Sequence, residues 1–134
     1  MLITFMRDCD EEVDLFAHCK VDCLMELMFL SVLREYRAKG IARKLCEVSI
    51  DFAKQLFAGK CSKVSTTGEQ LPTEPVPKLV SATFTTFITQ KIGESLGFTK
   101  AASIWFNRWS FNGKTFAERL DHETLYVTVE YVHF

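Results

Sequence analysis

The sequence lacks the features of a membrane-spanning or exported protein. Its longest apolar run, residues 24–33, is interrupted by Glu26 and Ser31 and is far shorter than the roughly 20 residues that a spanning helix needs. The N-terminus turns acidic after six residues, which does not match a signal peptide. We therefore expect no membrane contact and a cytoplasmic location.

The sequence also lacks a disulfide framework and a complete zinc motif. Its five cysteines are odd in number, and none lies in the last 73 residues, so paired disulfides are not expected. His18, Cys19 and Cys23 resemble half of a zinc site, but no second ligand pair follows at the usual spacing. The remaining candidates are Cys46, Cys61, His122 and His133. We expect reduced cysteines and no metal.

An excess of positive charge is absent as well. The chain has 16 basic and 17 acidic residues, a net charge of −1, which argues against a general nucleic-acid binder. The charge is uneven, however. Residues 1–26 hold seven acids against two bases, whereas residues 34–44 hold five bases against one acid. A local basic cluster in a nearly neutral protein suits a small polyanionic ligand.

The 134 residues suit one domain, and hydropathy patterns divide it into alternating elements. We expect a short acidic helix or turn at 11–18 and a long loop at 60–78, which holds all three prolines. Strands are expected at 24–33, 79–83, 101–111 and 124–132, the last half-buried, and helices at 41–57 and 84–96. Ile41, Leu45, Val48, Phe52 and Leu56 form the expected apolar face of the first helix. This order predicts an α/β (α+β) fold with parallel pairing and a final antiparallel pair.

The junction between strand 24–33 and helix 41–57 carries the clearest chemical signal. It reads Arg37-Ala38-Lys39-Gly40-Ile41-Ala42. Free backbone N–H groups and the helix dipole at such a junction bind phosphate, and Arg37, Lys39, Arg43 and Lys44 supply positive charge. The alternative is a solvated basic helix start with a turn glycine. Gly113-Lys114-Thr115 resembles the end of a Walker A loop, but Arg108 stands where that motif has its first glycine.

The same junction resembles a known motif. Leu30-Ser31-Val32, followed by residues 36–42, is similar to the acetyl-CoA-binding motif Arg/Gln-x-x-Gly-x-Gly/Ala of the GNAT N-acetyltransferases. A longer resemblance, over 11–58 and 79–132, is to the insect arylalkylamine (dopamine) N-acetyltransferases. It implies a partial GNAT fold: a mixed sheet with central parallel strands, helices on its faces and a C-terminal antiparallel strand pair.

The resemblance implies roles for named residues. Backbone groups of Leu30, Ser31 and Val32 would pair with the pantetheine arm of acetyl-CoA, and an N–H near the end of that strand would polarise the thioester. The pyrophosphate would be held by backbone N–H groups of the motif, which comprises Arg37, Ala38, Lys39, Gly40, Ile41 and Ala42. Thr85 and Thr89 match two serines that assist proton transfer, and their spacing predicts one helix face. The alternative is that these hydroxyls bond to carbonyls of their own helix.

The sequence also departs from the family. The usual domain begins with a strand, two helices and two further strands, which this chain lacks, so nothing matches the family's catalytic glutamate. Glu26 lies where other branches place a base; the alternative is a paired or edge-facing carboxylate. We therefore expect an acetyl-CoA-dependent N-acetyltransferase of a small amine, or else a non-catalytic or incomplete relative. The uncovered edge of the first strand would permit self-association.

Overall fold

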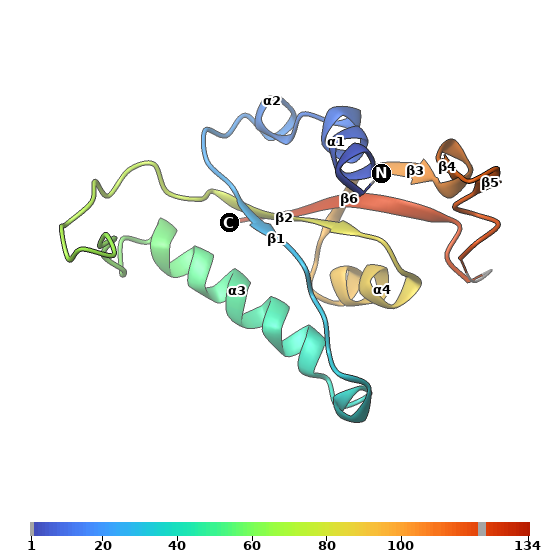
Figure 1. Cartoon of the computed structure of the whole chain (residues 1–134). Helices are drawn as coiled ribbons and strands as arrows, with labels where there is room; N and C mark the ends of the chain where they lie inside the picture. The colour runs from blue at the N-terminus through green and yellow to red at the C-terminus, as the bar shows by residue number, and fades with distance from the viewer. Residues whose placement is uncertain (1, 121–122) are drawn as a thin grey trace.

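A computed structural model describes residues 2–120 and 123–134 (Figure 1). Two helices precede the first strand, and the remaining helices alternate with strands. In chain order the elements are α1 (Leu2–Glu12), α2 (Leu15–Cys19), β1 (Met25–Leu27), the 3-10 helix η1 (Arg34–Tyr36), α3 (Ile41–Phe57), β2 (Leu79–Phe84), α4 (Phe87–Ser95), β3 (Thr99–Trp105), the 3-10 helix η2 (Phe106–Arg108), β4 (Ser110–Phe111), β5 (Lys114–Thr115) and β6 (Tyr126–His133).

The main sheet has the strand order β1-β2-β6-β3. β1 pairs parallel with β2, and β6 pairs antiparallel with both β2 and β3. The expected mixed α/β fold and its C-terminal antiparallel pair are therefore confirmed. The parallel pair lies at one edge of this sheet rather than at its centre, because the last strand in the sequence inserts between β2 and β3.

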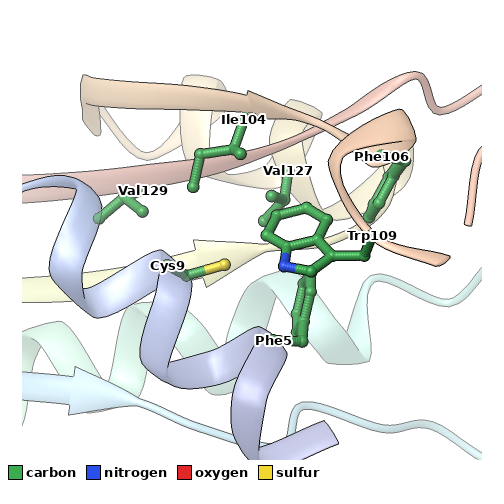
Figure 2. Close-up of a cluster of buried hydrophobic side chains, with 7 residues drawn as sticks. All are labelled: Phe5, Cys9, Ile104, Phe106, Trp109, Val127 and Val129. Atoms are coloured by element: carbon green, nitrogen blue, oxygen red, sulfur yellow. The ribbon is translucent and has the colours of Figure 1, made fainter. Parts of the chain in front are cut away.

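Helices cover both faces of the sheet: α1 and α2 lie on one side, α3 and α4 on the other (Figure 1). Residues 127–130 of β6 are all buried, so both faces of the strand are covered in its middle, where the sequence predicts one buried face. On the α1 side, Figure 2 shows one core cluster, made of Phe5, Cys9, Ile104, Phe106, Trp109, Val127 and Val129. Trp109 Nε1 also donates a hydrogen bond to Asp8 Oδ2 over 2.8 Å, which fixes α1 against the chain after β3.

The second core cluster lies under α3. It contains Ile50 and Ala53 from the helix, Val80, Ala82 and Phe84 from β2, and Phe98. The predicted helix is confirmed, but its expected apolar face is not the buried one. Ile41, Leu45, Val48 and Phe52 are exposed, whereas Cys46, Ile50 and Ala53 are buried. Both sets recur at helical spacing, and α3 turns the second set toward the sheet.

Three expected boundaries differ from the structure. β1 stops at Leu27 instead of residue 33, because Phe29 has a φ of 55° and leaves the extended conformation. α4 begins at Phe87, after the N-cap Thr86. β3 ends at Trp105, and residues 106–108 form η2.

Two further segments are irregular or short. Residues 58–78, which include the expected loop, contain no helix or strand beyond an isolated bridge between Val64 and Gln70. Gly113, Lys114 and Thr115 belong to the small β4–β5 hairpin, not to a phosphate loop. Within residues 2–120 and 123–134, no helix combines the length and apolarity required to cross a bilayer.

Candidate functional site

The site is built where β1 and β2 separate. The two strands are paired at Met25, Glu26 and Leu27, which lie opposite Val80, Ser81 and Ala82. Beyond Leu27 the chain turns away from β2 toward η1 (Figure 1). Phe29 is 80% exposed despite its left-handed backbone, a conformation that costs a non-glycine residue about 1–2 kcal/mol. The strain thus coincides with the point at which the sheet opens.

A cavity of about 600 Å³ fills this opening. Phe5 and Met6 of α1 contribute to its wall, and so do Leu45, Cys46 and Ser49 of α3. Because α1 and α3 lie on opposite faces of the sheet, the cavity extends through the sheet between the separated strands. Its remaining lining comes from residues 25–31 after and within β1, and from Thr83, Phe84, Thr85 and Thr89. We refer to it as the through-sheet cavity.

The start of α3 has the backbone geometry of an anion site. Gly40 is the N-cap with a φ of 74° and no side-chain cap, and Ala38 has a φ of 59°. The first N–H groups of the 17-residue helix therefore have no side-chain acceptor at the cap. Residues 33–41 are all exposed, so a ligand can reach them. Partial positive charge at a helix N-terminus favours phosphate there.

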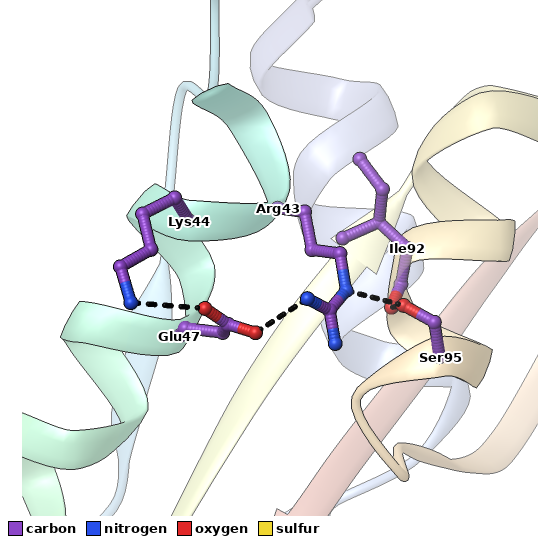
Figure 3. A network of polar contacts seen from close by, with 5 residues as sticks. All are labelled: Arg43, Lys44, Glu47, Ile92 and Ser95. Atoms are coloured by element: carbon purple, nitrogen blue, oxygen red, sulfur yellow. Dashed lines mark hydrogen bonds and ion pairs between the residues drawn. The ribbon is translucent and has the colours of Figure 1, made fainter. Parts of the chain in front are cut away.

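Only part of the basic cluster remains available to a ligand. Arg43 Nη1 lies 2.6 Å from Glu47 Oε1, and Lys44 Nζ lies 3.2 Å from Glu47 Oε2 (Figure 3). Arg43 Nε also donates to Ser95 Oγ, which in turn donates to the carbonyl of Ile92. These contacts join the first turns of α3 to the end of α4.

The other two expected cations lie in the turn itself. Arg37 Nε donates to the carbonyl of Val32 over 3.0 Å, and among the described residues its other guanidinium nitrogens form no ion pair. Lys39 Nζ lies 5.4 Å from the centre of the Tyr36 ring. Arg37 and Lys39 are therefore the cations of the motif that remain next to the exposed helix start.

The two threonines occupy different positions from those expected. Thr85 lies in the β2–α4 connection, before the helix begins, so the prediction that both share a helix face is wrong. Thr89 belongs to a capping box: its Oγ1 accepts from the N–H of Thr86, and its N–H donates to Thr86 Oγ1. Thr89 Oγ1 also donates to the carbonyl of Thr86. Both threonines nevertheless line the through-sheet cavity.

Glu26 is on the α1 face of the sheet, opposite Ser81. The residue is exposed and lines the cavity, and partial desolvation of its carboxyl, followed by the negative charge of Asp10, raises the pKa of Glu26. Among the described residues, no cation forms an ion pair with it. A carboxylate with a raised pKa beside a cavity is a stronger base than an ordinary glutamate.

α1 was missed in the sequence, although it supplies part of the cavity wall. Phe5, Met6, Cys9 and Val13 recur three and four residues apart, which is a helical signal, but the short helix or turn that we expect from the sequence begins only at residue 11. Among the residues that the structure describes, no three His, Cys, Asp or Glu side chains could hold a metal ion. His122 lies outside the described residues.

No protein-family model matches the chain, and no curated protein matches its sequence. Its fold is similar to solved structures of insect enzymes. Arylalkylamine N-acetyltransferase 2 from Aedes aegypti is matched with a TM-score of 0.71 and 20% identity, over 98% of this chain and 52% of that one. Mosquito arylalkylamine N-acetyltransferase like 5b gives 0.74 and 16%, over 99% and 54%. The chain thus has part of the acetyltransferase fold and spans about half the length of these enzymes.

Proposed function

We propose that the chain binds acetyl-CoA at the β1–α3 junction and transfers the acetyl group to a small amine, of the arylalkylamine or dopamine-like kind. One observation carries this proposal. The through-sheet cavity is lined by α3 on one face and by α1 on the other, so an acyl donor and an amine can approach the same point from opposite sides. The similarity of the fold to two arylalkylamine N-acetyltransferases supports the same function.

The donor would bind along the exposed segment before α3. Residues 28–33 pair with no other strand among the described residues, so backbone groups of Leu30 and Ser31 and the N–H of Val32 would pair with the amide groups of the pantetheine arm, while the Val32 carbonyl accepts from Arg37. The pyrophosphate would lie at the helix start, on the N–H groups between Ala38 and Ala42. Arg37 and Lys39 would neutralise its charge.

The acetyl thioester would then lie in the through-sheet cavity near Phe29. The amine nitrogen attacks the carbonyl carbon, the carbon–sulfur bond breaks, and the electron pair of that bond leaves with the CoA sulfur as a thiolate. The ammonium proton goes to a base, and a proton returns to the thiolate. Of the residues that line this cavity, Glu26 is the acid with a raised pKa, so it would act as the base. The hydroxyl of Thr85, or of Thr89 after release from its cap, would relay a proton.

Calorimetric titration with CoA tests the binding step. Gly40→Asp places a negative charge at the helix start and a side chain at a φ of 74°, so we expect no measurable CoA binding. Gly59→Asp is a matched control, because Gly59 follows the other end of α3, has a φ of 67° and also has free space around its Cβ position. Equal affinity of the Gly40→Asp variant and the original chain would refute the proposal.

A second candidate is a CoA-binding relative that does not catalyse transfer. Two observations favour it: Thr89 is engaged in the cap of α4, and the chain spans about half of the similar enzymes. A steady-state assay with acetyl-CoA and dopamine or tryptamine separates the two candidates. CoA binding without turnover supports the second, and turnover that is lost in Glu26→Gln supports the first.

A further inference from the structure

Glu47, in the second turn of α3, forms ion pairs with two basic residues of the first turn. Its Oε1 lies 2.6 Å from Arg43 Nη1, and its Oε2 lies 3.2 Å from Lys44 Nζ (Figure 3). The Glu47 side chain is 26% exposed, against 49% for Arg43 and 72% for Lys44. A partly covered carboxylate with a cation on each oxygen is held more firmly than one member of an isolated surface pair.

The two cations are directed away from the start of the helix. Glu47 is four residues after Arg43 and three after Lys44, and each residue of an α-helix advances about 1.5 Å along its axis. Figure 3 shows both side chains extending from the first turn toward Glu47. A phosphate would bind the N–H groups at the opposite end, next to Gly40. Each cation must therefore leave Glu47 before it can reach a phosphate there.

A third contact fixes the orientation of Arg43. Its Nε donates to Ser95 Oγ over 3.2 Å, and Ser95 Oγ donates to the carbonyl of Ile92 over 2.8 Å. The guanidinium is therefore bonded both to its own helix and to the end of α4. A ligand that recruits Arg43 breaks both contacts, which costs more than the separation of one exposed ion pair.

The charge that remains at the helix start suits two phosphates better than three. Within the described residues Arg37 and Lys39 form no ion pair, and Arg34 and Glu35 before them balance each other in charge. Each phosphate of the CoA pyrophosphate carries one negative charge, so Arg37 and Lys39 neutralise the pair. The 3′-phosphate of CoA is a monoester and adds a charge of about −1.5 to −2 at pH 7. Glu47 leaves this third phosphate without a free cation.

We propose that Glu47 determines which phosphates the site recognises: it restricts the site to the pyrophosphate by withholding Arg43 and Lys44 from the 3′-phosphate. The inference rests on the proposed binding of CoA at the β1–α3 junction and not on acetyl transfer. Dephospho-CoA has the pyrophosphate and the pantetheine arm and lacks only the 3′-phosphate. It should therefore bind nearly as well as CoA. Removal of the Glu47 charge releases both cations and creates a preference for CoA.

The test is calorimetric titration of the original chain and of Glu47→Gln with CoA and with dephospho-CoA. For the original chain we expect the two dissociation constants to agree within about threefold. Glu47→Gln keeps the size of the side chain and removes its charge. It should bind CoA about five- to tenfold more tightly than the original chain does, because charge-assisted hydrogen bonds to the 3′-phosphate become available. Its affinity for dephospho-CoA should rise by no more than about twofold.

The ratio of the two affinities is the decisive measurement, because a general loss of structure would weaken both ligands together. A second variant that combines Glu47→Gln with Arg43→Gln should lose most of the gain in CoA affinity. Asp51→Asn is the matched control: Asp51 lies one turn beyond Glu47 on α3, is exposed and forms no ion pair among the described residues. This control changes the net charge of the chain by the same amount.

An equal gain in CoA affinity for Asp51→Asn and Glu47→Gln would reveal a general effect of net charge and would overturn the inference. A preference of the original chain for CoA of about tenfold or more, or equal tightening of both ligands in Glu47→Gln, would also overturn it while leaving the proposed function intact. Absence of binding of both ligands would refute the proposed function and this inference together. The expected affinities without any acetyl transfer would support this inference and refute only the transfer step.

Discussion

Glu26 and Ser81 lie opposite each other in the β1–β2 pair, one position before the last paired residues, Leu27 and Ala82. The carboxylate and the hydroxyl therefore stand at the fork where the strands separate, and Glu26 lines both the through-sheet cavity and a second cavity of about 400 Å³ beside α1 and α2. A single side chain thus borders both spaces.

The raised pKa of Glu26 predicts a pH-dependent effect on stability. Its ordinary value is 4.5, and the folded chain holds the proton more tightly than the unfolded chain does. Stability is therefore lost as pH rises from about 4.5 through the raised folded pKa. Glu26→Gln should be more stable than the original chain at pH 7, and the difference should vanish below pH 4.5.

Urea unfolding between pH 4 and pH 8 measures this difference. Glu94→Gln is the control, because Glu94 is an exposed carboxylate on α4, away from both cavities. A Glu26→Gln variant with the same pH profile as the original chain would show that burial and Asp10 do not act on this carboxyl.

Ala38 predicts a stabilising substitution. Its φ of 59° is unfavourable for a side chain with a Cβ atom, so Ala38→Gly should raise the free energy of unfolding by about 1 kcal/mol. Ala58→Gly is the control, since Ala58 has a φ of −77° and should lose about 0.5–1 kcal/mol through backbone entropy. Thermal and urea unfolding of both variants checks the opposite signs; loss of stability in both would contradict the assignment of strain to Ala38.

The close packing around Gly93 predicts a destabilising substitution. A Cβ at this buried position in α4 would overlap the Phe84 ring and approach Glu130 Oε2 to 3.0 Å. Gly93→Ala should therefore lower the free energy of unfolding by about 1–3 kcal/mol through overpacking. Addition of Phe84→Leu should recover part of this loss, because it removes ring atoms from the contact. A double variant whose loss equals the sum of the two single losses would exclude this contact as the cause.

The exposed apolar residues of α3 lead to two predictions: lysine substitutions are tolerated there, and the original chain self-associates. Val48 and Phe52 are 55% and 48% exposed, so Val48→Lys and Phe52→Lys should change stability by no more than about 0.5 kcal/mol. Ile50→Lys should unfold the chain, because Ile50 is buried against β2.

Light scattering should show concentration-dependent association of the original chain through this surface and the free edge of β1. A monodisperse monomer at all concentrations would argue against it.

The sequence predicted α3 and the turn that precedes it well, because both depend on local signals. Helical spacing and the glycine at position 40 are visible without knowledge of the rest of the chain. The end of β1 was not predictable in the same way: Phe29 adopts a left-handed conformation that its side chain disfavours, so tertiary structure must impose it. The prediction for Thr85 was wrong for a related reason. Thr86 caps α4, so Thr85 lies outside the helix.

The sequence analysis named candidate residues on the side of the site that leads into α3, but none from α1. The contributions of Phe5, Met6 and Asp10 depend on α1 packing across the sheet from β1. A pattern in residues 2–12 alone indicates a helix but does not indicate which strand it covers. The choice between the two apolar faces of α3 likewise depends on β2, which is 22 positions further along the chain.

The insertion of β6 between β2 and β3 has a consequence for synthesis. During translation, β2 and β3 leave the ribosome before the strand that lies between them, so neither has β6 as its neighbour until residues 126–133 emerge. Nascent chains that stop short of β6 would present open strand edges to chaperones and to other chains. A frameshift or early stop codon in this short stretch should therefore cause aggregation and degradation as severely as the loss of a whole domain.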